Sequence, residues 1–274
     1  MIYNFLESSE DRKNSEIIIV GYPFDSTSSF RSGSRNGPNS LRFFSWNLET
    51  FSNYQKKDIH TKNYFDMGDI ELPLGNIKKT NEIIFKTTKK LLKSNKKIIS
   101  LGGEHSITYP IIKAFNDFYD DFILIVFDAH ADLREEYMGT AFSHACVTRN
   151  CAKLIGERRI CQLGIRSYTE EEYEFSKKLL FFNERLDSFD FDLIKNKKIY
   201  ISVDLDVLDP SILPGTGTPE AGGLNFKEFI DFLLKFKNFE IIGTDIVELS
   251  PEHDVSGISS AAAAKIVREL ILLL

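Results

Sequence analysis

The sequence predicts an α/β protein of three layers, in which helices cover both faces of a central, mostly parallel sheet of about eight strands. Short apolar runs rich in Ile, Val and Phe recur along the 274 residues, and segments with helical spacing of apolar residues stand between them. Such alternation is typical of parallel sheets, whose strands are buried on both faces and therefore contain few polar residues. A chain of this length can bury about three quarters of its unfolded surface in a single domain.

The expected strands are apolar runs that end in glycine or in charged residues. In chain order they are 16–22, 64–70, 97–101, 122–127, 159–165, 179–182, 198–204 and 240–247. No internal repeat, low-complexity segment or long linker divides the chain, so one domain spanning residues 1–274 is expected.

The expected helices fill the intervals between these strands. They lie at 38–48, 81–92, 107–118, 144–155, 169–178 and 225–236, and the run 266–274 is the last helix, docked on the core. The first follows a loop rich in Ser, Gly and Arg and opens on a proline, and the second carries apolar residues at helical spacing with lysines outside.

Composition narrows the class of protein. A net charge of -6 and a pI near 5.5 argue against a nucleic-acid or anionic-membrane partner and favour cationic small molecules. Residues 1–10 lack the basic and then apolar order of a signal peptide, and 266–274 is too short to span a bilayer. The odd number of cysteines has no paired metal-ligand spacing, which predicts reduced thiols in a cytoplasmic protein; these are Cys146, Cys151 and Cys161.

Candidate metal ligands follow three of the expected strands. Side chains two residues apart point to the same side of an extended chain, and ligands collect at the carboxyl ends of parallel strands. Carboxylates and imidazoles aimed at one point repel and desolvate one another unless a cation lies between them. The candidates are His105 after two glycines, then Asp128, His130 and Asp132, and finally Asp204 and Asp206.

These residues together supply four carboxylates and two imidazoles. Such an oxygen-rich set suits Mn²⁺ better than Zn²⁺, which prefers fewer and softer ligands. Four negative charges balance two divalent ions, so a binuclear centre is expected. Two ions roughly 3.5–4 Å apart could share a bridging water and lower its pKa from about 15.7 toward neutrality, which generates a hydroxide nucleophile.

Three segments contain these ligands: Gly-Gly-Glu-His-Ser at 102–106, Asp-Ala-His-Ala-Asp at 128–132, and Ser-Val-Asp-Leu-Asp-Val-Leu-Asp-Pro at 202–210. They resemble the three signatures of the ureohydrolases, the arginase and agmatinase family of binuclear manganese enzymes. Segments 214–223 and 245–251 also look like the family, as do Arg31, Gly33, Gly37-Pro38 and Leu41-Arg42 near the N-terminus. The resemblance covers nearly the whole chain and implies an arginase-like fold, a small guanidino substrate and a homo-oligomer, trimeric or hexameric.

The resemblance also implies a ligand set for two manganese ions. One ion is expected to bind His105, Asp128, Asp132 and Asp204, and the other to bind His130, Asp128, Asp204 and Asp206, so that Asp128 and Asp204 bridge the pair.

Three residues receive catalytic roles from the same resemblance. Glu248 occupies the position that hydrogen-bonds the substrate guanidinium, and His144 matches a histidine that relays protons near the site mouth. The implied reaction is attack of the metal-bridging hydroxide on the guanidinium carbon, followed by collapse to urea and an amine. Asp132 is expected to carry the proton to the leaving nitrogen, because an amine leaves poorly unless it is protonated.

The expected substrate is agmatine, cleaved to urea and putrescine. Segment 133–137 departs from the carboxylate-binding loop of arginases, while 143–145 and 163–167 look like agmatinases. Glu135 and Glu136 are expected to form an acidic mouth that suits an ammonium tail. Arg134 could instead pair with a carboxylate, so arginase, guanidinobutyrase and formimidoylglutamase remain alternatives.

Other classes fit the residues less well. A binuclear phosphoesterase would need basic residues to hold phosphate, a metal-free regulatory chain would have a broken ligand set, and related deacetylases use a single zinc.

A thiol nucleophile with a histidine base is another alternative, formed by Cys146 and His144. These residues lie two apart at a helix start, where side chains do not face each other, so we discount it. Asp209 is expected to hold the turn into Pro210, and for Glu104 a role beside the ligands and a capping or solvent-facing role are equally open.

Overall fold

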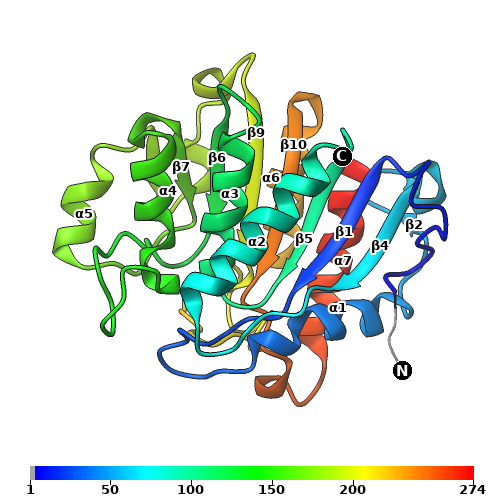
Figure 1. Cartoon of the computed structure of the whole chain (residues 1–274), viewed down its shortest axis with the longest axis horizontal. Coiled ribbons are helices and arrows are strands. Elements are labelled where there is room, and N and C mark those ends of the chain that lie inside the picture. Colours follow the sequence, from blue (N-terminus) through cyan, green and yellow to red (C-terminus); the bar gives the residue numbers. More distant parts are fainter. Residues whose placement is uncertain (1–3) are drawn as a thin grey trace.

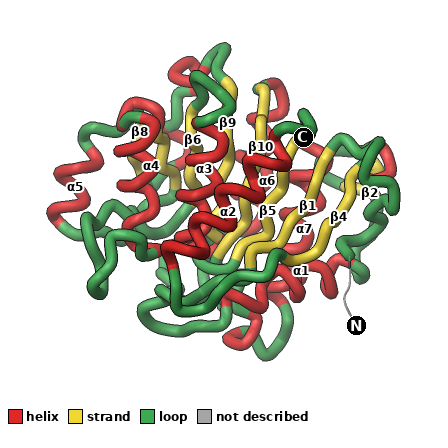
Figure 2. Tube along the Cα trace, viewed as in Figure 1, coloured by secondary structure: helices red, strands yellow, loops and turns green. Residues whose placement is uncertain are grey.

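A computed structural model describes residues 4–274, so the first three residues of the segment 1–10 lie outside it. Within this range the chain forms three layers around an eight-stranded sheet in the order β4-β1-β5-β10-β9-β6-β7-β8 (Figures 1 and 2). Every neighbouring pair in the sheet is parallel. The predicted fold class is confirmed, and the sheet is fully rather than mostly parallel.

The strands of this sheet lie close to the predicted runs. They are β1 (Ile17–Tyr22), β4 (Tyr64–Asp69), β5 (Lys97–Gly102), β6 (Ile123–Phe127), β7 (Ile160–Leu163), β8 (Phe181–Asn183), β9 (Lys198–Asp204) and β10 (Glu240–Val247). The short strands β2 (Phe51–Ser52) and β3 (Lys57–Asp58) form a separate antiparallel pair that the sequence did not predict.

Helices cover both faces of the sheet. They are α1 (Gly37–Ser45), α2 (Ile77–Leu92), α3 (Thr108–Asn116), α4 (Val147–Ile155), α5 (Glu170–Ser176), α6 (Phe226–Leu233) and α7 (Ile258–Leu273). Successive strand residues alternate between two cores: Ile17 and Ile19 pack with α1, α6 and α7, whereas Ile18 and Val20 pack with α2, α3 and α4. None of the helices within residues 4–274 has both the length and the apolar character needed to cross a bilayer.

Two helices begin earlier than predicted. In α2 the side chain of Asn76 accepts a hydrogen bond from the backbone of Lys79 and caps the helix start. Its buried face includes Thr80 and Thr88, whose hydroxyls interrupt the apolar pattern. Helix α7 starts after Gly257, eight residues before the predicted run 266–274, because its first turns are built from Ser and Ala.

The strand register sets the level at which polar residues leave the sheet. Val247 pairs with Asp204, and Phe127 pairs with Val203. Asp128 and Asp204 therefore stand level with each other, and Glu248 follows one step later on the neighbouring strand. The centre of the sheet thus gathers its polar residues at one edge, as expected for the carboxyl ends of parallel strands.

Candidate metal centre and substrate cavity

His105 reaches the site because two glycines precede it. A Cβ added to Gly103 would lie 2.0 Å from the backbone oxygen of Phe24, so only glycine lets these two chain segments approach this closely. His105 then opens a short 3₁₀ turn before α3, and its side chain is 1% exposed.

The loop after β6 brings its three ligand candidates together by turning sharply rather than by continuing as a strand. The strand ends at Phe127, and the Asp128 carboxylate accepts a hydrogen bond of 2.6 Å from the backbone of His130. Asp132 has a φ of 51°, a left-handed conformation that is uncommon outside glycine. Loop geometry, rather than alternation along a strand, places Asp128 within reach of both His130 and Asp132, which belong to different groups of candidate ligands.

The two aspartates after β9 are held by backbone hydrogen bonds. The backbone N–H of Asp206 donates to Asp204 Oδ1 at 3.0 Å, and that of Ala129 donates to Asp206 Oδ1 at 3.0 Å. The second bond links the loops that follow β6 and β9. Each carboxylate keeps its other oxygen for the site.

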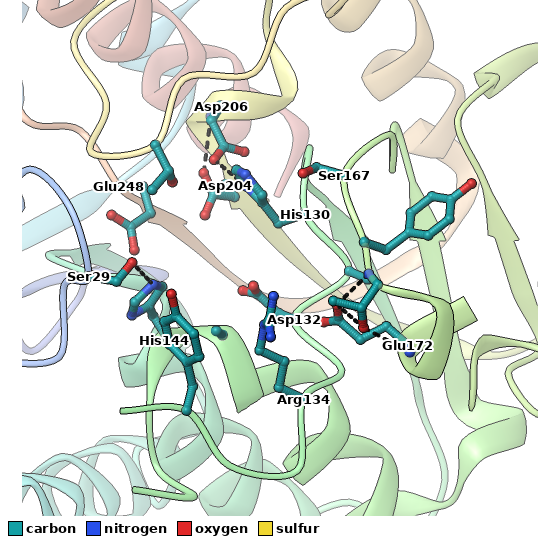
Figure 3. Close-up of a pocket in the computed structure, with 16 residues that line it drawn as sticks. Ser29, His130, Asp132, Arg134, His144, Ser167, Glu172, Asp204, Asp206 and Glu248 are labelled. Atoms are coloured by element: carbon teal, nitrogen blue, oxygen red, sulfur yellow. Dashed lines mark hydrogen bonds and ion pairs between the residues drawn. The ribbon is translucent and has the colours of Figure 1, made fainter. Parts of the chain in front are cut away.

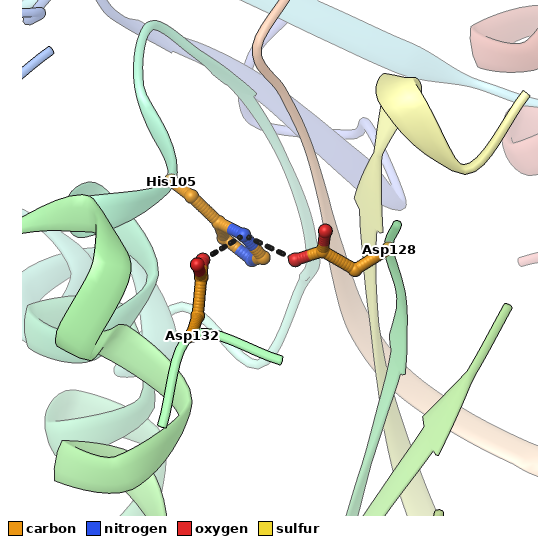
Figure 4. A group of neighbouring side chains, drawn as sticks. All are labelled: His105, Asp128 and Asp132. Carbon is orange, nitrogen blue, oxygen red and sulfur yellow. Dashed lines mark ion pairs between the residues drawn. The ribbon is translucent and has the colours of Figure 1, made fainter. Parts of the chain in front are cut away.

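These residues form two overlapping groups. The Nδ1 atom of His105 lies 3.1 Å from Asp128 Oδ2, 3.3 Å from Asp132 Oδ2 and 3.2 Å from Asp204 Oδ2. Figure 4 shows Asp128 and Asp132 on either side of the His105 ring. Both groups, His105–Asp128–Asp132 and Asp128–His130–Asp206, have ligand atoms close enough to share a metal ion.

Asp128 belongs to both groups. Its Oδ2 faces His105, whereas its Oδ1 lies 3.7 Å from Nδ1 of His130. The same His130 nitrogen lies 2.9 Å from Asp206 Oδ2. One carboxylate therefore stands between two histidine-containing clusters.

The electrostatics of this arrangement favour a cation. Burial raises the pKa of Asp128 well above its usual range, and repulsion from Asp204, Asp206 and Asp132 raises it further. Burial and then repulsion from Asp206 raise the pKa of Asp204 to about 7. Burial alone would lower the pKa of His130, yet the contact with Asp206 raises it to about 11. Like charges packed this closely in a dry site are stabilised by positive charge between them.

Three buried atoms at the site make no hydrogen bond of acceptable angle within the described chain, although each lies close to an imidazole or carboxylate atom: His105 Nδ1, Asp128 Oδ2 and Asp206 Oδ2. Buried polar atoms are normally hydrogen-bonded, so unsatisfied ones facing each other suggest a missing partner. Oxygen and imidazole nitrogen atoms are ligands that divalent manganese accepts. The residues present therefore fit a pair of metal ions.

Glu248 faces the same space from the end of β10. One of its oxygens accepts a hydrogen bond of 2.7 Å from the backbone N–H of His105, and its φ of 66° is again left-handed. Burial raises the pKa of Glu248 well above its usual range, and repulsion from Asp204 and Glu104 adds to this. The predicted guanidinium-binding residue thus lies directly beside the candidate ligands.

A cavity of about 250 Å³ opens over these groups. Figure 3 shows Glu248 and His144 at one side of it and Arg134 with Glu172 at another. The residues that line it are Ser29, His130, Ala131, Asp132, Arg134, Tyr137, His144, Ala145, Ser167, Tyr168, Thr169, Glu172, Asp204, Asp206, Thr218 and Glu248. The three residues to which the sequence analysis gave catalytic roles, Asp132, His144 and Glu248, therefore all line the same cavity.

His144 is held at this cavity by hydroxyl groups from the loop after β1. Its Nε2 lies 3.3 Å from Ser29 Oγ and its Nδ1 lies 3.4 Å from Thr27 Oγ1, while its backbone N–H donates to Thr27 Oγ1 at 3.0 Å. The ring also meets Tyr137 edge-on, with centroids 6.2 Å apart. Cys146, in contrast, is buried, points its thiol toward the backbone oxygen of Thr140 and is not among the residues that line the cavity.

Glu104, for which two roles were open, is fully buried beside the ligands. Its carboxylate accepts hydrogen bonds from the backbone of Thr27 at 2.7 Å, from the Thr27 hydroxyl at 2.5 Å and from the Ser106 hydroxyl. Glu104 therefore ties the loop that holds His144 to the turn that carries His105. Glu104 stands at the N-cap position of the 3₁₀ turn that begins at His105, but its side chain makes no capping bond and does not face solvent, so the role beside the ligands describes it best.

The prediction that Glu135 and Glu136 form an acidic mouth of the cavity is wrong. Glu135 pairs with Arg149 and Lys153 on the surface, and neither it nor Glu136 lines the cavity. The outer wall instead contains Arg134, which contacts the ring of Tyr137 at 4.8 Å. The charge pattern on consecutive residues did not indicate which side chains turn inward.

Two arginines hold the loop at 214–223, which contributes Thr218 to the cavity wall. The sequence analysis assigned a role to neither arginine. Arg31 donates to the backbone oxygens of Thr216 and Gly217, and Arg166 donates to those of Glu220 and Ala221. Asp209 accepts hydrogen bonds from the backbone and hydroxyl of Ser211 and from the backbone at 222 and 223, as predicted for a residue that holds this turn.

Comparison with known proteins gives a single family. The model of the arginase family matches residues 15–273. This chain belongs to the arginase family. It is similar to the agmatinase of Bacillus anthracis, with 39% identity over 98% of this chain and 95% of that protein. It is also 39% identical to N(1)-aminopropylagmatine ureohydrolase of Thermococcus kodakarensis, over 88% of this chain and 84% of that protein.

The fold agrees with this membership. The crystal structure of agmatine ureohydrolase of Thermoplasma volcanium superimposes with a TM-score of 0.90 at 33% identity, covering 100% of this chain and 94% of that one. As a member of the arginase family with agmatinase relatives, the protein is a hydrolase that acts on guanidino groups.

Proposed function

We propose that this arginase-family protein is a binuclear manganese hydrolase that cleaves agmatine to urea and putrescine, with residues 1–274 as a single catalytic domain. The observation that carries the proposal is the pair of histidine–carboxylate groups that share Asp128, 3.1 Å from His105 and 3.7 Å from His130, beneath a cavity lined by Glu248. The agmatinase relatives support the choice of substrate.

The proposed ligands are those whose free atoms point at one another. His105, Asp128, Asp132 and Asp204 would hold one ion, and His130, Asp128, Asp204 and Asp206 the other. Two bound divalent ions would supply a hydroxide nucleophile near neutral pH, because they lower the pKa of a shared water.

The chain's own groups would bind and orient the substrate. The Glu248 carboxylate, fixed by the backbone of His105 at 2.7 Å, is available to accept hydrogen bonds from a guanidinium. This contact aims the planar guanidinium carbon at the floor of the cavity. Burial of Glu248 strengthens the contact, since a charge-assisted bond gains from a low dielectric.

Proton transfer would use Asp132 and His144. The Asp132 carboxylate lines the floor and could accept a proton and pass it to the departing nitrogen, which leaves readily only when protonated. His144 lies partly exposed between the Ser29 and Thr27 hydroxyls and could exchange protons with solvent.

The tail of the substrate would lie along the outer wall. Glu172 is the carboxylate there, and it accepts hydrogen bonds from the backbone of Leu133 and Thr169. It would attract the ammonium of agmatine. Arg134 would repel the same ammonium, because it lines the cavity and its guanidinium makes no ion pair within residues 4–274. A guanidino acid, whose carboxylate Arg134 would attract, is therefore the second candidate substrate.

The test is urea release by the manganese-loaded protein from agmatine, arginine, 4-guanidinobutanoate and N(1)-aminopropylagmatine at equal concentrations. The proposal expects the highest kcat/KM with agmatine. A clear preference for 4-guanidinobutanoate or arginine would assign the carboxylate-tail alternative, and release of another product in place of urea would exclude both.

A cytoplasmic location and a homo-oligomeric assembly are also proposed. The three cysteines are buried and unpaired, which is typical of a reducing compartment. Light scattering of the purified protein tests the assembly, for which a trimer or hexamer is expected from the family resemblance.

A further inference from the structure

Asp245 lies in the middle of the sheet, on β10, and has no access to solvent. Its carboxylate accepts hydrogen bonds from three hydroxyls: Ser202 Oγ at 2.6 Å, Tyr200 OH at 2.9 Å and Thr108 Oγ1 at 3.1 Å. Within residues 4–274 it makes no ion pair. Burying a carboxylate without a countercharge costs free energy. The hydrogen bond from Ser202 is one of the contacts that offset this cost, and Ser202 also contacts His105.

Ser202 connects Asp245 to a candidate metal ligand. Its hydroxyl lies 3.1 Å from Nε2 of His105 and, on the other side, donates to Asp245 Oδ1. A serine hydroxyl has a single proton. Because Asp245 receives that proton, Ser202 can only accept a hydrogen bond from His105, and Nε2 must be the protonated nitrogen.

The consequence falls on the other nitrogen of the same ring. A neutral imidazole has one N–H, so its Nδ1 has a free lone pair when Nε2 is protonated. His105 Nδ1 is the atom that faces Asp128, Asp132 and Asp204, and it has no hydrogen-bond partner within the described chain. The form of His105 set by Ser202 is the one that can bind a cation.

We propose that Asp245 is a positioning residue that acts through Ser202 to hold His105 in its metal-binding tautomer and orientation, and so strengthens divalent-metal binding. The inference rests on the proposed metal-binding role of His105. Partners behind a ligating histidine typically change metal affinity by about 10- to 100-fold when they are removed.

Asp245→Asn tests the direction of the proton. An amide nitrogen can donate to Ser202, which frees the serine hydroxyl to donate to His105 and to favour protonation of Nδ1. The matched controls are Tyr200→Phe and Thr108→Val, because each removes one donor to the same carboxylate and leaves Ser202 in place.

The readout is Mn²⁺ binding to the metal-free proteins, measured by titration calorimetry and by the electron paramagnetic resonance of unbound Mn²⁺. We expect Asp245→Asn and Ser202→Ala each to weaken the tighter site about 10- to 100-fold. The double variant should bind no more weakly than Ser202→Ala alone, since Asp245 acts only through that serine. The two controls should stay within about threefold of the unaltered protein.

Unchanged Mn²⁺ affinity in Asp245→Asn would overturn the inference, as would additive losses in the double variant. If Asp245→Asn fails to fold, as judged by circular dichroism, Ser202→Thr and Ser202→Ala decide the matter: the threonine should keep the affinity and the alanine should lose it, and equal affinities would refute the role of the hydroxyl.

The result is separable from the choice of substrate. An unaltered protein that binds no Mn²⁺ would overturn both this inference and the proposed metal centre. Preference for a guanidino acid over agmatine, with the expected losses of affinity in the variants, would correct the substrate alone.

Discussion

The hydroxyl of Thr27 and the carboxylate of Glu104 lie 2.5 Å apart, although 77 residues separate them in the chain. The same hydroxyl accepts a hydrogen bond from the backbone of His144 at 3.0 Å. A buried carboxylate next to a candidate metal ligand therefore supports the loop on which the candidate proton-relay histidine rests. Through this contact, the turn that carries the candidate metal ligand His105 is connected to the part of the cavity that contains His144.

Glu104→Gln should lower kcat with agmatine by about 10- to 100-fold, because an amide replaces one of the oxygens that hold Thr27 and a small misplacement of a catalytic group is costly. Manganese content should stay at the level of the unaltered protein, which separates this effect from damage to His105. The exposed capping residue Glu228, changed to Gln, is the control. Equal kcat values for Glu104→Gln and the control would contradict the supporting role.

Arg134→Met should shift substrate preference toward agmatine. Its guanidinium lines the cavity and has no countercharge in contact among residues 4–274, so it repels an ammonium tail and attracts a carboxylate. A unit charge at roughly 8 Å with an effective dielectric near 20 contributes about 2 kcal/mol, or roughly thirtyfold. Because the effect has opposite sign for the two tails, the ratio of kcat/KM for agmatine to that for 4-guanidinobutanoate should rise by up to the product of the two factors, about 4 kcal/mol or roughly 10³-fold. Lys195→Met, an exposed lysine before β9, should leave the ratio unchanged.

Asp128→Asn should lose both manganese and activity, because it removes the charge shared by the two histidine groups. Metal analysis of the dialysed variant should find fewer than two ions per chain, and urea release should fall at least a hundredfold. Asp209→Asn, which alters a carboxylate in the nearby turn, should retain its metal. Normal metal content with normal turnover in Asp128→Asn would rule out the bridging role.

Manganese should stabilise the folded protein against heat. Four buried carboxylates share the site, and a ligand that binds only the native state stabilises it by about 2.7 kcal/mol at 100 times its dissociation constant. The unfolding temperature should therefore rise with Mn²⁺ concentration and fall on chelation. An unfolding temperature independent of Mn²⁺ would indicate that no such ion binds.

Arg42→Met should destabilise the fold without reaching the site. The Arg42 side chain is 1% exposed and pairs with Asp66 at 2.7 Å and Asp69 at 2.5 Å. Removing one partner of a buried ion pair typically costs about 3–5 kcal/mol, because the remaining charge stays buried. Urea-induced unfolding would measure this loss. Arg185→Met, which breaks an exposed pair with Asp187, should cost under about 1 kcal/mol.

The strands could be predicted closely because each is buried on both faces and is therefore a nearly continuous apolar run. The strand at 198–204 has identical bounds in the structure, and that at 97–101 differs by a single residue. The starts of helices were predicted less accurately. Polar capping residues and buried threonines are compatible with a helix, but they interrupt the apolar spacing from which a helix is predicted. The order of strands, with β10 between β5 and β9, has no local signal in the chain.

The amino-acid sequence by itself determined the parallel sheet and the chemical identity of the candidate ligands, because strand periodicity and side-chain chemistry are local properties. Only the tertiary structure decided that Arg134 turns into the cavity while Glu135 pairs on the surface, and that Asp245 reaches His105 through Ser202. These relationships depend on strand order, on left-handed backbone at Asp132 and Glu248, and on contacts between residues far apart in the chain, none of which is a property of a short segment.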